Sequence, residues 1–210
     1  MKKGLFFSFE GVDGCGKSTQ IRFLAEYLTQ EGYQVLTTRE PGGCPISEQI
    51  REILLSKESQ GMEALTEAFL YAAARVEHVH KVILPALEQG KIVLCDRFID
   101  SSLAYQGVAR DLGISRVLEI NRHVYEICRP DATIYLQFAA KDCFERMNEN
   151  KELDRLELEG DAFFAKVQKG FEQVAKQFPD RILVIDASGS KYETQEKVQQ
   201  AVLTLLAQRN

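Results

Sequence analysis

Residues 11–18 read GVDGCGKS and match the pattern G-x-x-x-x-G-K-[ST] at every fixed position. A short apolar run at residues 5–10 predicts a buried strand before the motif, and residues 17–30 carry apolar side chains at helical spacing after it. In this context the glycines turn several backbone N–H groups inward, and the helix N-terminus adds partial positive charge. The sequence therefore predicts a phosphate-binding loop, and a glycine-rich turn without a ligand is the disfavoured alternative.

The side chains of this loop predict how a nucleotide and its metal ion are held. Lys17 reaches the β- and γ-phosphates, and the Ser18 hydroxyl ligates Mg²⁺. Asp96, at the end of another predicted strand, holds the metal through water, or alternatively caps the next helix. A nucleotide with β- and γ-phosphates and Mg²⁺ are thus the predicted ligands of the loop. The predicted nucleotide-binding residues are Gly11, Val12, Asp13, Gly14, Cys15, Gly16, Lys17, Ser18 and Thr19.

Strands alternate with helices along the sequence, which predicts an α/β fold with a parallel sheet and helices on both faces. The predicted strands are residues 5–10, 33–38, 91–95, 132–138 and 182–186. The predicted helices are residues 17–30, 46–55, 66–87 with a bend near Pro85, 117–127, 163–177 and a last helix that includes Val198 and Leu206. We expect a single domain over residues 1–210, because the length suits one core.

The charge balance excludes several classes of partner. The chain has 26 Lys and Arg against 31 Asp and Glu, a net charge of −5, whereas affinity for nucleic acids and anionic membranes needs clustered basic residues. No apolar stretch approaches the roughly 20 residues that span a bilayer. The five cysteines are widely spaced, which predicts reduced thiols in the cytoplasm. Residues 150–154 read NKELD and miss the N-K-x-D spacing of a guanine-specific switch.

Residues 142–160 form the most polar part of the middle of the chain. Two interpretations are open. The segment is either a solvated helix hairpin, the usual meaning of a charged run, or a mobile lid over a binding site. Composition alone favours the hairpin.

Basic and aromatic residues are predicted near the carboxyl ends of the strands, where open α/β sheets bind ligands. Tyr71, Arg75 and His78 recur at i, i+4 and i+7 and share one helix face. A Tyr–Arg pair at this spacing can stack on and hydrogen-bond to a planar heterocycle, although an ordinary surface patch is an equal alternative. Arg39 and Arg97 follow predicted strands and add positive charge.

Six motifs resemble those of bacterial thymidylate kinases, in the family's order and over essentially the whole chain. They are FEGVDG at 9–14, TREPGG at 38–43, YAAAR at 71–75, DRF at 96–98, SSLAYQG at 101–107 and LDRLE at 153–157. The resemblance implies a P-loop kinase fold with a five-stranded parallel sheet and a short lid at about residues 142–160. It also implies that a homodimer packed through helices transfers the ATP γ-phosphoryl group to dTMP, giving dTDP and ADP for dTTP synthesis.

The resemblance further implies roles at the acceptor base and sugar. Tyr71 would stack on thymine, Arg75 would reach a base carbonyl, and Gln106 would meet the base edge. Tyr105 would crowd the sugar 2′ position and so disfavour ribonucleotides. The implied substrate-binding residues are Arg39, Tyr71, Arg75, Arg97, Ser102, Tyr105 and Gln106.

At the phosphates, the resemblance implies that Arg97 and Arg39 hold the acceptor phosphate and that Asp13 faces the sugar 3′-hydroxyl. Asp96 would serve Mg²⁺ together with Ser18. Because a phosphate monoester is already anionic near pH 7, the reaction needs no general base. Catalysis is then mostly positioning and charge neutralisation by Mg²⁺, Lys and Arg.

The lid departs from the family's pattern. Such kinases take a transition-state arginine from the P-loop or from the lid, and the P-loop here has Gly14, so the lid should supply it. Yet residues 145–152 read ERMNENKE, with asparagine at two positions where arginine is expected. We expect Arg146 or Arg155 to bridge the phosphates, with Lys151 as a weaker substitute. The predicted catalytic residues are Lys17, Asp13, Arg97, Arg146 and Arg155.

Several alternatives stay open. Arg155 could instead pair with Asp154 or Glu157 and hold the lid helix. The chain could be another nucleoside monophosphate kinase or a deoxynucleoside kinase of the same fold, or a nucleotide-binding regulator without transferase activity. The adenine edge is expected at residues 187–190, after the last strand.

Overall fold

The computed structural model describes residues 4–139, 143 and 154–207. Most of the predicted lid, including Arg146 and Lys151, lies outside the described residues. The motifs at residues 9–14, 38–43, 71–75, 96–98 and 101–107 all lie within the described residues.

Five parallel strands form one sheet with the order β2-β3-β1-β4-β5. The strands are β1 (Leu5–Glu10), β2 (Val35–Arg39), β3 (Ile92–Asp96), β4 (Ala132–Gln137) and β5 (Ile182–Asp186). The central strand β1 pairs with β3 on one side and β4 on the other, and all of its residues except Leu5 are buried. This confirms the predicted five-stranded parallel sheet, because continuous apolar runs are the signature of strands covered on both faces.

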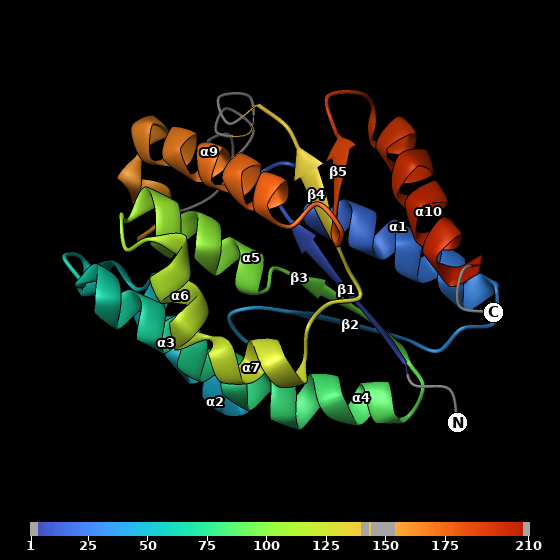
Figure 1. Ribbon diagram of the computed structural model, residues 1–210, viewed down its shortest axis with the longest axis horizontal. Coiled ribbons are helices and arrows are strands. Elements are labelled where there is room, and N and C mark those ends of the chain that lie inside the picture. Colours follow the sequence, from blue (N-terminus) through green and yellow to red (C-terminus); the bar gives the residue numbers. More distant parts are fainter. Residues whose placement is uncertain (1–3, 140–142, 144–153, 208–210) are drawn as a thin grey trace.

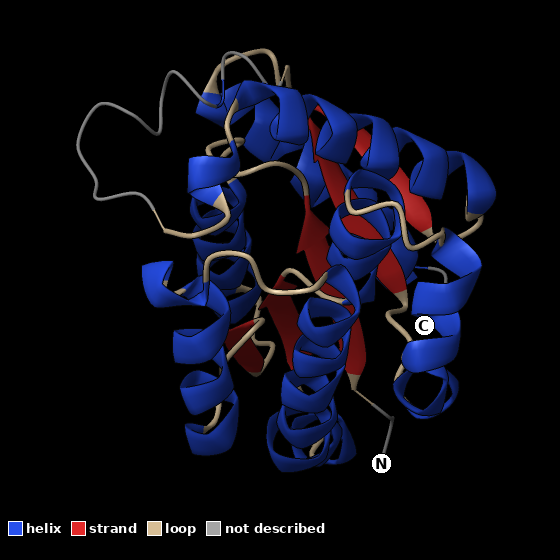
Figure 2. Cartoon of the chain, turned by 90° about the vertical axis from the view of Figure 1, so that its left-hand side faces the viewer, coloured by secondary structure: helices blue, strands red, loops and turns tan. Residues whose placement is uncertain are grey.

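Helices cover both faces of the sheet (Figures 1 and 2). On one face α1 (Lys17–Gln30) packs beside α10 (Lys191–Ala207). The other face carries α2 (Pro45–Leu55), η1 (Lys57–Ser59), α3 (Ala64–His78), α4 (Leu84–Glu88), α5 (Ile99–Ser102), α6 (Ile114–Ile120), α7 (Arg122–Ile127), η4 (Glu157–Glu159) and α9 (Asp161–Gln177). None of the helices in these described segments is long and apolar enough to cross a membrane.

The long helix predicted at residues 66–87 is present but irregular. It runs as α3, then a π-helical turn η2 (Val79–Ile83), then α4. Pro85 has no backbone N–H and its ring excludes the carbonyl of residue 81 from an ordinary helical position. A wider turn just before a proline accommodates this clash, so the sequence locates the irregularity.

One helical segment is not among the predicted elements. Residues 99–109 form α5 and a π-helical stretch η3 (Leu103–Ala109), and nearly all of them are buried. A helix buried on every side has no polar stripe, so its sequence shows no helical periodicity. Gly170 of α9 permits close packing here, since a Cβ atom at that position would lie 2.8 Å from the Ala104 carbonyl oxygen. The segment matters because it carries Tyr105 and Gln106.

Candidate active site

A cavity of about 360 Å³ opens at the carboxyl ends of β1, β2 and β3. The phosphate-binding loop forms one wall, and residues from α2, α3 and η3 form the others. Of the sequence-predicted site residues, those that line the cavity are Asp13, Gly14, Gly16, Lys17, Ser18, Thr19, Arg39, Tyr71, Arg75, Asp96, Arg97, Ser102, Tyr105 and Gln106.

The phosphate-binding loop has the glycine geometry that its sequence predicts. Gly11, Gly14 and Gly16 all have positive φ, and Gly16 is the residue before α1. A Cβ atom at Gly11 would come within 2.8 Å of the Leu136 carbonyl oxygen, so the turn excludes a side chain there. The Lys17 amine is buried and donates to the carbonyl oxygens of Gly11 and Val12, both at 3.1 Å. The lysine is therefore curled against the loop that would hold phosphate.

Ser18 and Asp96 meet at the start of α1. The Ser18 hydroxyl donates to Asp96 Oδ2 at 3.0 Å. The other carboxylate oxygen, Oδ1, is buried and has no hydrogen-bond partner within the described part of the chain. A hydroxyl beside a carboxylate with an unsatisfied oxygen fits a hard divalent cation. Mg²⁺ takes most of its ligands from water and phosphate, so these two side chains would be enough to hold it.

Arg97 joins the loop to the acceptor side of the cavity. One of its terminal nitrogens donates to Asp13 at 2.6 Å and to the Tyr105 hydroxyl at 3.2 Å. The other donates to the Gly11 carbonyl at 3.0 Å and to the Ser101 hydroxyl at 2.9 Å. The Arg97 backbone has φ 70, an uncommon conformation for a residue with a side chain. Such local strain is frequent where a side chain must be aimed at a ligand.

Asp13 is held as an anion by this arrangement. Burial by itself raises the pKa of Asp13, but the positive charges of Arg97 and Lys17 outweigh that effect and lower the pKa well below its usual value. The Tyr105 hydroxyl also donates to Asp13, at 3.1 Å. Asp13 can therefore accept a hydrogen bond from a ligand hydroxyl at neutral pH.

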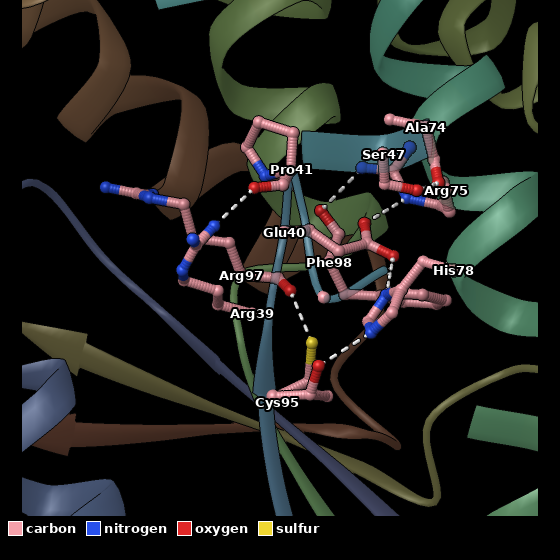
Figure 3. A network of polar contacts seen from close by, with 12 residues as sticks. Arg39, Glu40, Pro41, Ser47, Ala74, Arg75, His78, Cys95, Arg97 and Phe98 are labelled. Atoms are coloured by element: carbon pink, nitrogen blue, oxygen red, sulfur yellow. Dashed lines mark hydrogen bonds and ion pairs between the residues drawn. The ribbon is translucent and has the colours of Figure 1, made fainter. Parts of the chain in front are cut away.

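The helix face that bears Tyr71, Arg75 and His78 is not a surface patch. Arg75 and His78 are buried and both point at Glu40 (Figure 3). Arg75 Nε donates to one Glu40 oxygen at 2.7 Å, and His78 Nδ1 lies 3.0 Å from the other. His78 Nε2 in turn lies 2.7 Å from the Thr38 hydroxyl. His78 thus supports Glu40, while Tyr71 and Arg75 line the cavity.

Every nitrogen of the Arg75 guanidinium is engaged. Besides Glu40, it donates to Asn121 Oδ1 at 2.5 Å, to the Phe98 carbonyl at 3.2 Å and to the Ser102 hydroxyl at 3.0 Å. Asn121 also separates α6 from α7, where the sequence predicts one continuous helix at 117–127. Four of the five guanidinium N–H groups are thus bonded to protein acceptors, which holds Arg75 in a fixed position at the wall of the cavity.

Arg39 and a residue missed by the sequence analysis, Arg51, lie together at the rim. Both donate to the Pro41 carbonyl at 2.9 Å, and Arg39 also pairs with Glu48 at 2.9 Å. Burial lowers the pKa of Arg51, and the neighbouring charge of Arg39 lowers it further. Two guanidinium groups this close suit an anionic ligand. The signal that could have identified Arg51 is its position in α2, one helical turn after Ser47, which is buried.

Arg155 lies away from the phosphate loop and is not among the described residues that line the cavity. Its side chain is buried, donates from Nε to the Leu54 carbonyl at 2.7 Å and pairs with Glu67 at 2.7 Å. This geometry supports a structural role for Arg155 better than a phosphate-bridging role. Its ion-pair partner is Glu67, whereas the sequence analysis suggested Asp154 or Glu157. Asp154 and Glu157 instead bond to each other's backbone N–H groups.

The phosphate loop, the Ser18–Asp96 pair and the arginines facing them define a P-loop nucleotide kinase. A sequence model of the thymidylate kinase family matches residues 9–198. A thymidylate kinase of Geobacillus sp. strain WCH70 is 52% identical over 188 residues, which cover 89% of this chain and 90% of that protein. A thymidylate kinase of Bacillus cytotoxicus is 49% identical over 202 residues, which cover 95% of this chain and 97% of that protein.

Solved structures agree with this assignment. The crystal structure of a thymidylate kinase from Ehrlichia chaffeensis aligns with a TM-score of 0.76 and 36% identity, over 96% of this chain and 99% of that one. The chain belongs to the thymidylate kinase family. The resemblance carried by the six sequence motifs is confirmed.

Glu10 ends β1 and supports the segment that carries Arg97. Its Oε1 accepts from the Phe98 backbone N–H at 2.8 Å, and its Oε2 accepts from the Ser101 hydroxyl at 2.5 Å. Burial raises the pKa of Glu10 to about 8, and the negative charge of Asp100 adds to the rise, whereas Arg97 opposes it. Between about pH 4.5 and pH 8, Glu10 therefore keeps a proton in the folded protein and loses it when the chain unfolds.

This difference predicts a pH dependence of stability. The raised pKa stabilises the fold fully below the ordinary Glu value of 4.5, and this stabilisation is lost as the pH rises through about 8. Over that range the free energy of unfolding should fall more steeply in the wild type than in Glu10→Gln, by up to about 1.4 kcal/mol per pH unit. Urea denaturation at several pH values measures the slope of the unfolding free energy with pH, and a Glu26→Gln variant at an exposed position is the control. Parallel curves for wild type and Glu10→Gln would contradict the prediction.

Proposed function

We propose that the chain transfers the terminal phosphoryl group of ATP to dTMP, giving ADP and dTDP. One observation carries this proposal. The Arg97–Asp13 pair joins the phosphate-binding loop, which suits the donor, to a pocket lined by Tyr71, Arg75 and Gln106, which suits a pyrimidine base. Donor and acceptor would therefore meet at one point of one cavity. The substrates and the absence of a membrane-spanning helix in the described residues favour the cytoplasm as its place of action.

The acceptor nucleotide fits the cavity with its base innermost. Tyr71 would stack on the thymine ring, and Arg75 would donate to a base carbonyl from a position fixed by Glu40. Gln106 lines the same end of the cavity and would meet the base edge. Ser102 supports Arg75 through its hydroxyl.

The sugar and the acceptor phosphate would occupy the middle of the cavity. Asp13 would accept a hydrogen bond from the 3′-hydroxyl, and Tyr105, which Asp13 holds at 3.1 Å, would crowd the 2′ position. Arg97 and Arg39 would hold the acceptor phosphate, and Arg51 lies close enough to Arg39 to share that anion. Arginine suits this task because its planar fork donates two parallel hydrogen bonds to phosphate oxygens.

Catalysis then rests on positioning and charge neutralisation. Lys17 would exchange its bonds to the neutral loop carbonyls for bonds to the anionic donor phosphates. Ser18 and Asp96 would hold Mg²⁺, which when bound neutralises charge on the donor phosphates. The acceptor oxygen is already anionic, so no side chain of this chain needs to take a proton from it. The adenine edge is proposed at residues 187–190, which follow β5.

An acceptor panel tests the proposed reaction. With ATP and Mg²⁺, a coupled assay of ADP release should show preferred turnover of dTMP over dUMP, CMP, AMP and thymidine. Lys17→Ala should abolish turnover, because Lys17 is the only basic residue among residues 11–19, while Lys169→Ala on the exposed face of α9 should leave it unchanged. Turnover of thymidine but not dTMP would favour a deoxynucleoside kinase. ATP binding without acceptor-dependent turnover would favour a nucleotide-binding regulator.

We further propose that residues 1–210 act as one domain with a lid at residues 142–160, and that Arg146 supplies the transition-state cation with Lys151 as a weaker substitute. Both residues lie outside the described part of the chain. The support is indirect. Arg155, the third basic residue of this segment, is committed to Glu67 and Leu54, so a role in holding the base of the lid suits it better.

Kinetics and stability should separate these two arginines. Arg146→Ala should lower kcat by about 10³-fold or more without changing the unfolding temperature, because an arginine finger acts only on the transition state. Arg155→Ala should lower the unfolding free energy by about 3–5 kcal/mol, because it leaves the buried Glu67 without its nearest cation. Exposed Arg116→Ala is the matched control. A stable Arg155→Ala variant with the larger loss of kcat would reverse the assignment.

We also propose a homodimer packed through helices. The support is a set of exposed apolar side chains on α2 and α3, two helices that pack together: Ile46, Ile53, Leu65, Phe69 and Val76. Phe69 is the most exposed of them, at 55%. Exposed apolar side chains gathered on adjacent helices are typical of a surface that another chain covers.

Sedimentation at micromolar concentration tests the dimer. The wild type should sediment as a dimer, and Phe69→Glu should sediment as a folded monomer, because a charge buried in an apolar interface is strongly unfavourable. Val184→Glu, a substitution of an exposed apolar residue on β5, should remain dimeric. A clean wild-type monomer would contradict the proposal.

A further inference from the structure

Glu67 of α3 is a fully buried carboxylate to which none of the roles above assigns a function in substrate recognition. Three side chains from other parts of the chain converge on it. The Gln106 carboxamide donates from Nε2 to Oε1 at 2.8 Å, and Arg155 donates to Oε2 at 2.7 Å. Arg110 lies slightly further away, with contacts of 3.3 and 3.4 Å.

The carboxylate decides which way the Gln106 side chain points. A carboxylate that faces two guanidinium groups accepts hydrogen bonds and has no proton to donate. Only the NH₂ end of a carboxamide can therefore lie against Glu67, since the carbonyl end would place two acceptors face to face. With its NH₂ group on Glu67, Gln106 has its carbonyl oxygen left for the cavity that it lines.

Arg75 is oriented by a second buried glutamate in the same way. A guanidinium has only N–H donors, and Glu40, which accepts from Arg75 Nε at 2.7 Å, fixes where those donors lie. The base pocket thus offers one fixed acceptor and one fixed donor. A thymine or uracil ring carries a ring N–H beside a carbonyl oxygen and complements that pair. A cytosine ring carries an unprotonated ring nitrogen beside an amino group and opposes it.

We propose that Glu67 is a specificity-determining positioning residue, which locks the Gln106 carboxamide so that the pocket accepts the ring N–H of thymine and rejects 4-amino pyrimidines. This inference rests on the proposed acceptor site. In a pocket where Gln106 turned freely, its NH₂ group could donate to the cytosine ring nitrogen and part of the discrimination would vanish. Glu67 removes that freedom because the turned carboxamide would lose its own hydrogen bond and face a buried anion.

The test is the ratio of kcat/KM for dTMP to kcat/KM for dCMP. Glu67→Gln replaces the fixed acceptor with a carboxamide that can donate or accept, which frees Gln106 to turn. The ratio should fall by about 10- to 100-fold, which is the effect expected when one buried hydrogen bond is lost and its donor or acceptor stays unsatisfied. A folded Glu67→Gln variant with an unchanged ratio would overturn the proposal, because a merely structural role would lower both rates together.

Arg110→Met is the matched control. Arg110 contacts Glu67 and Glu159 but does not line the cavity, so this variant removes a cation from the cluster and keeps the Gln106–Glu67 hydrogen bond. Its dTMP-to-dCMP ratio should equal that of the wild type. A fall as large as that of Glu67→Gln would show that loss of the ion cluster, and not the orientation of Gln106, sets the ratio, and would overturn the proposal.

Glu67→Gln leaves the buried Arg155 guanidinium without its carboxylate, while the partly exposed Arg110 keeps Glu159, so the variant could fail to fold. In that case the double variant Glu67→Gln/Arg155→Met removes the nearer cation along with the anion, a replacement that buried ion pairs often tolerate. Calorimetric dissociation constants for dTMP and dCMP then replace the kinetic ratio, with the same expected fall. A wild-type enzyme that does not phosphorylate dTMP would overturn the acceptor assignment and this inference together, whereas an unchanged ratio overturns only the inference.

Discussion

The pairing of each buried cation with a carboxylate is the constraint on which the rest of the site depends. A site for two polyanions needs a concentration of positive charge, and that charge is unfavourable in a folded protein without ligands. Arg97 pairs with Asp13, Arg75 with Glu40 and Arg155 with Glu67. Each carboxylate compensates the charge and also fixes the direction in which the cationic or amide group near it points. The same contacts thus serve stability and recognition.

These pairs explain how a chain with a net charge of −5 can bind phosphates. The total charge describes the whole surface, whereas the ligands meet only the lining of one cavity. Within that lining the basic residues Lys17, Arg39, Arg51, Arg75 and Arg97 balance and slightly outnumber the acidic residues Asp13, Glu40, Asp96 and Asp154. Long-range attraction of nucleotides is weak for such a protein, so affinity has to come from short, directed hydrogen bonds.

Sequence reasoning succeeds where a structural role leaves a local pattern. Buried strands show as apolar runs, and the phosphate loop shows as fixed glycines, so the sheet and the Lys17–Ser18 region were predictable. The helix at residues 99–109 was not, because complete burial removes its periodicity. Glu67 was not found either, since its partners Gln106, Arg110 and Arg155 lie 39, 43 and 88 residues away and no spacing relates them. Arg155 was named from the sequence, but its partner was not, because Glu67 lies 88 residues away on α3.

The strand order has a consequence for how the chain is made. The first strand synthesised, β1, lies in the centre of the sheet, and its neighbours are β3, which begins at Ile92, and β4, which begins at Ala132. At about 5–20 residues per second, the ribosome needs roughly 5–20 s to make the first of these partners. During that interval the apolar side chains of Phe6, Phe7 and Phe9 have no sheet to enter. The nascent chain therefore depends on chaperones or on transient local contacts until its second half emerges.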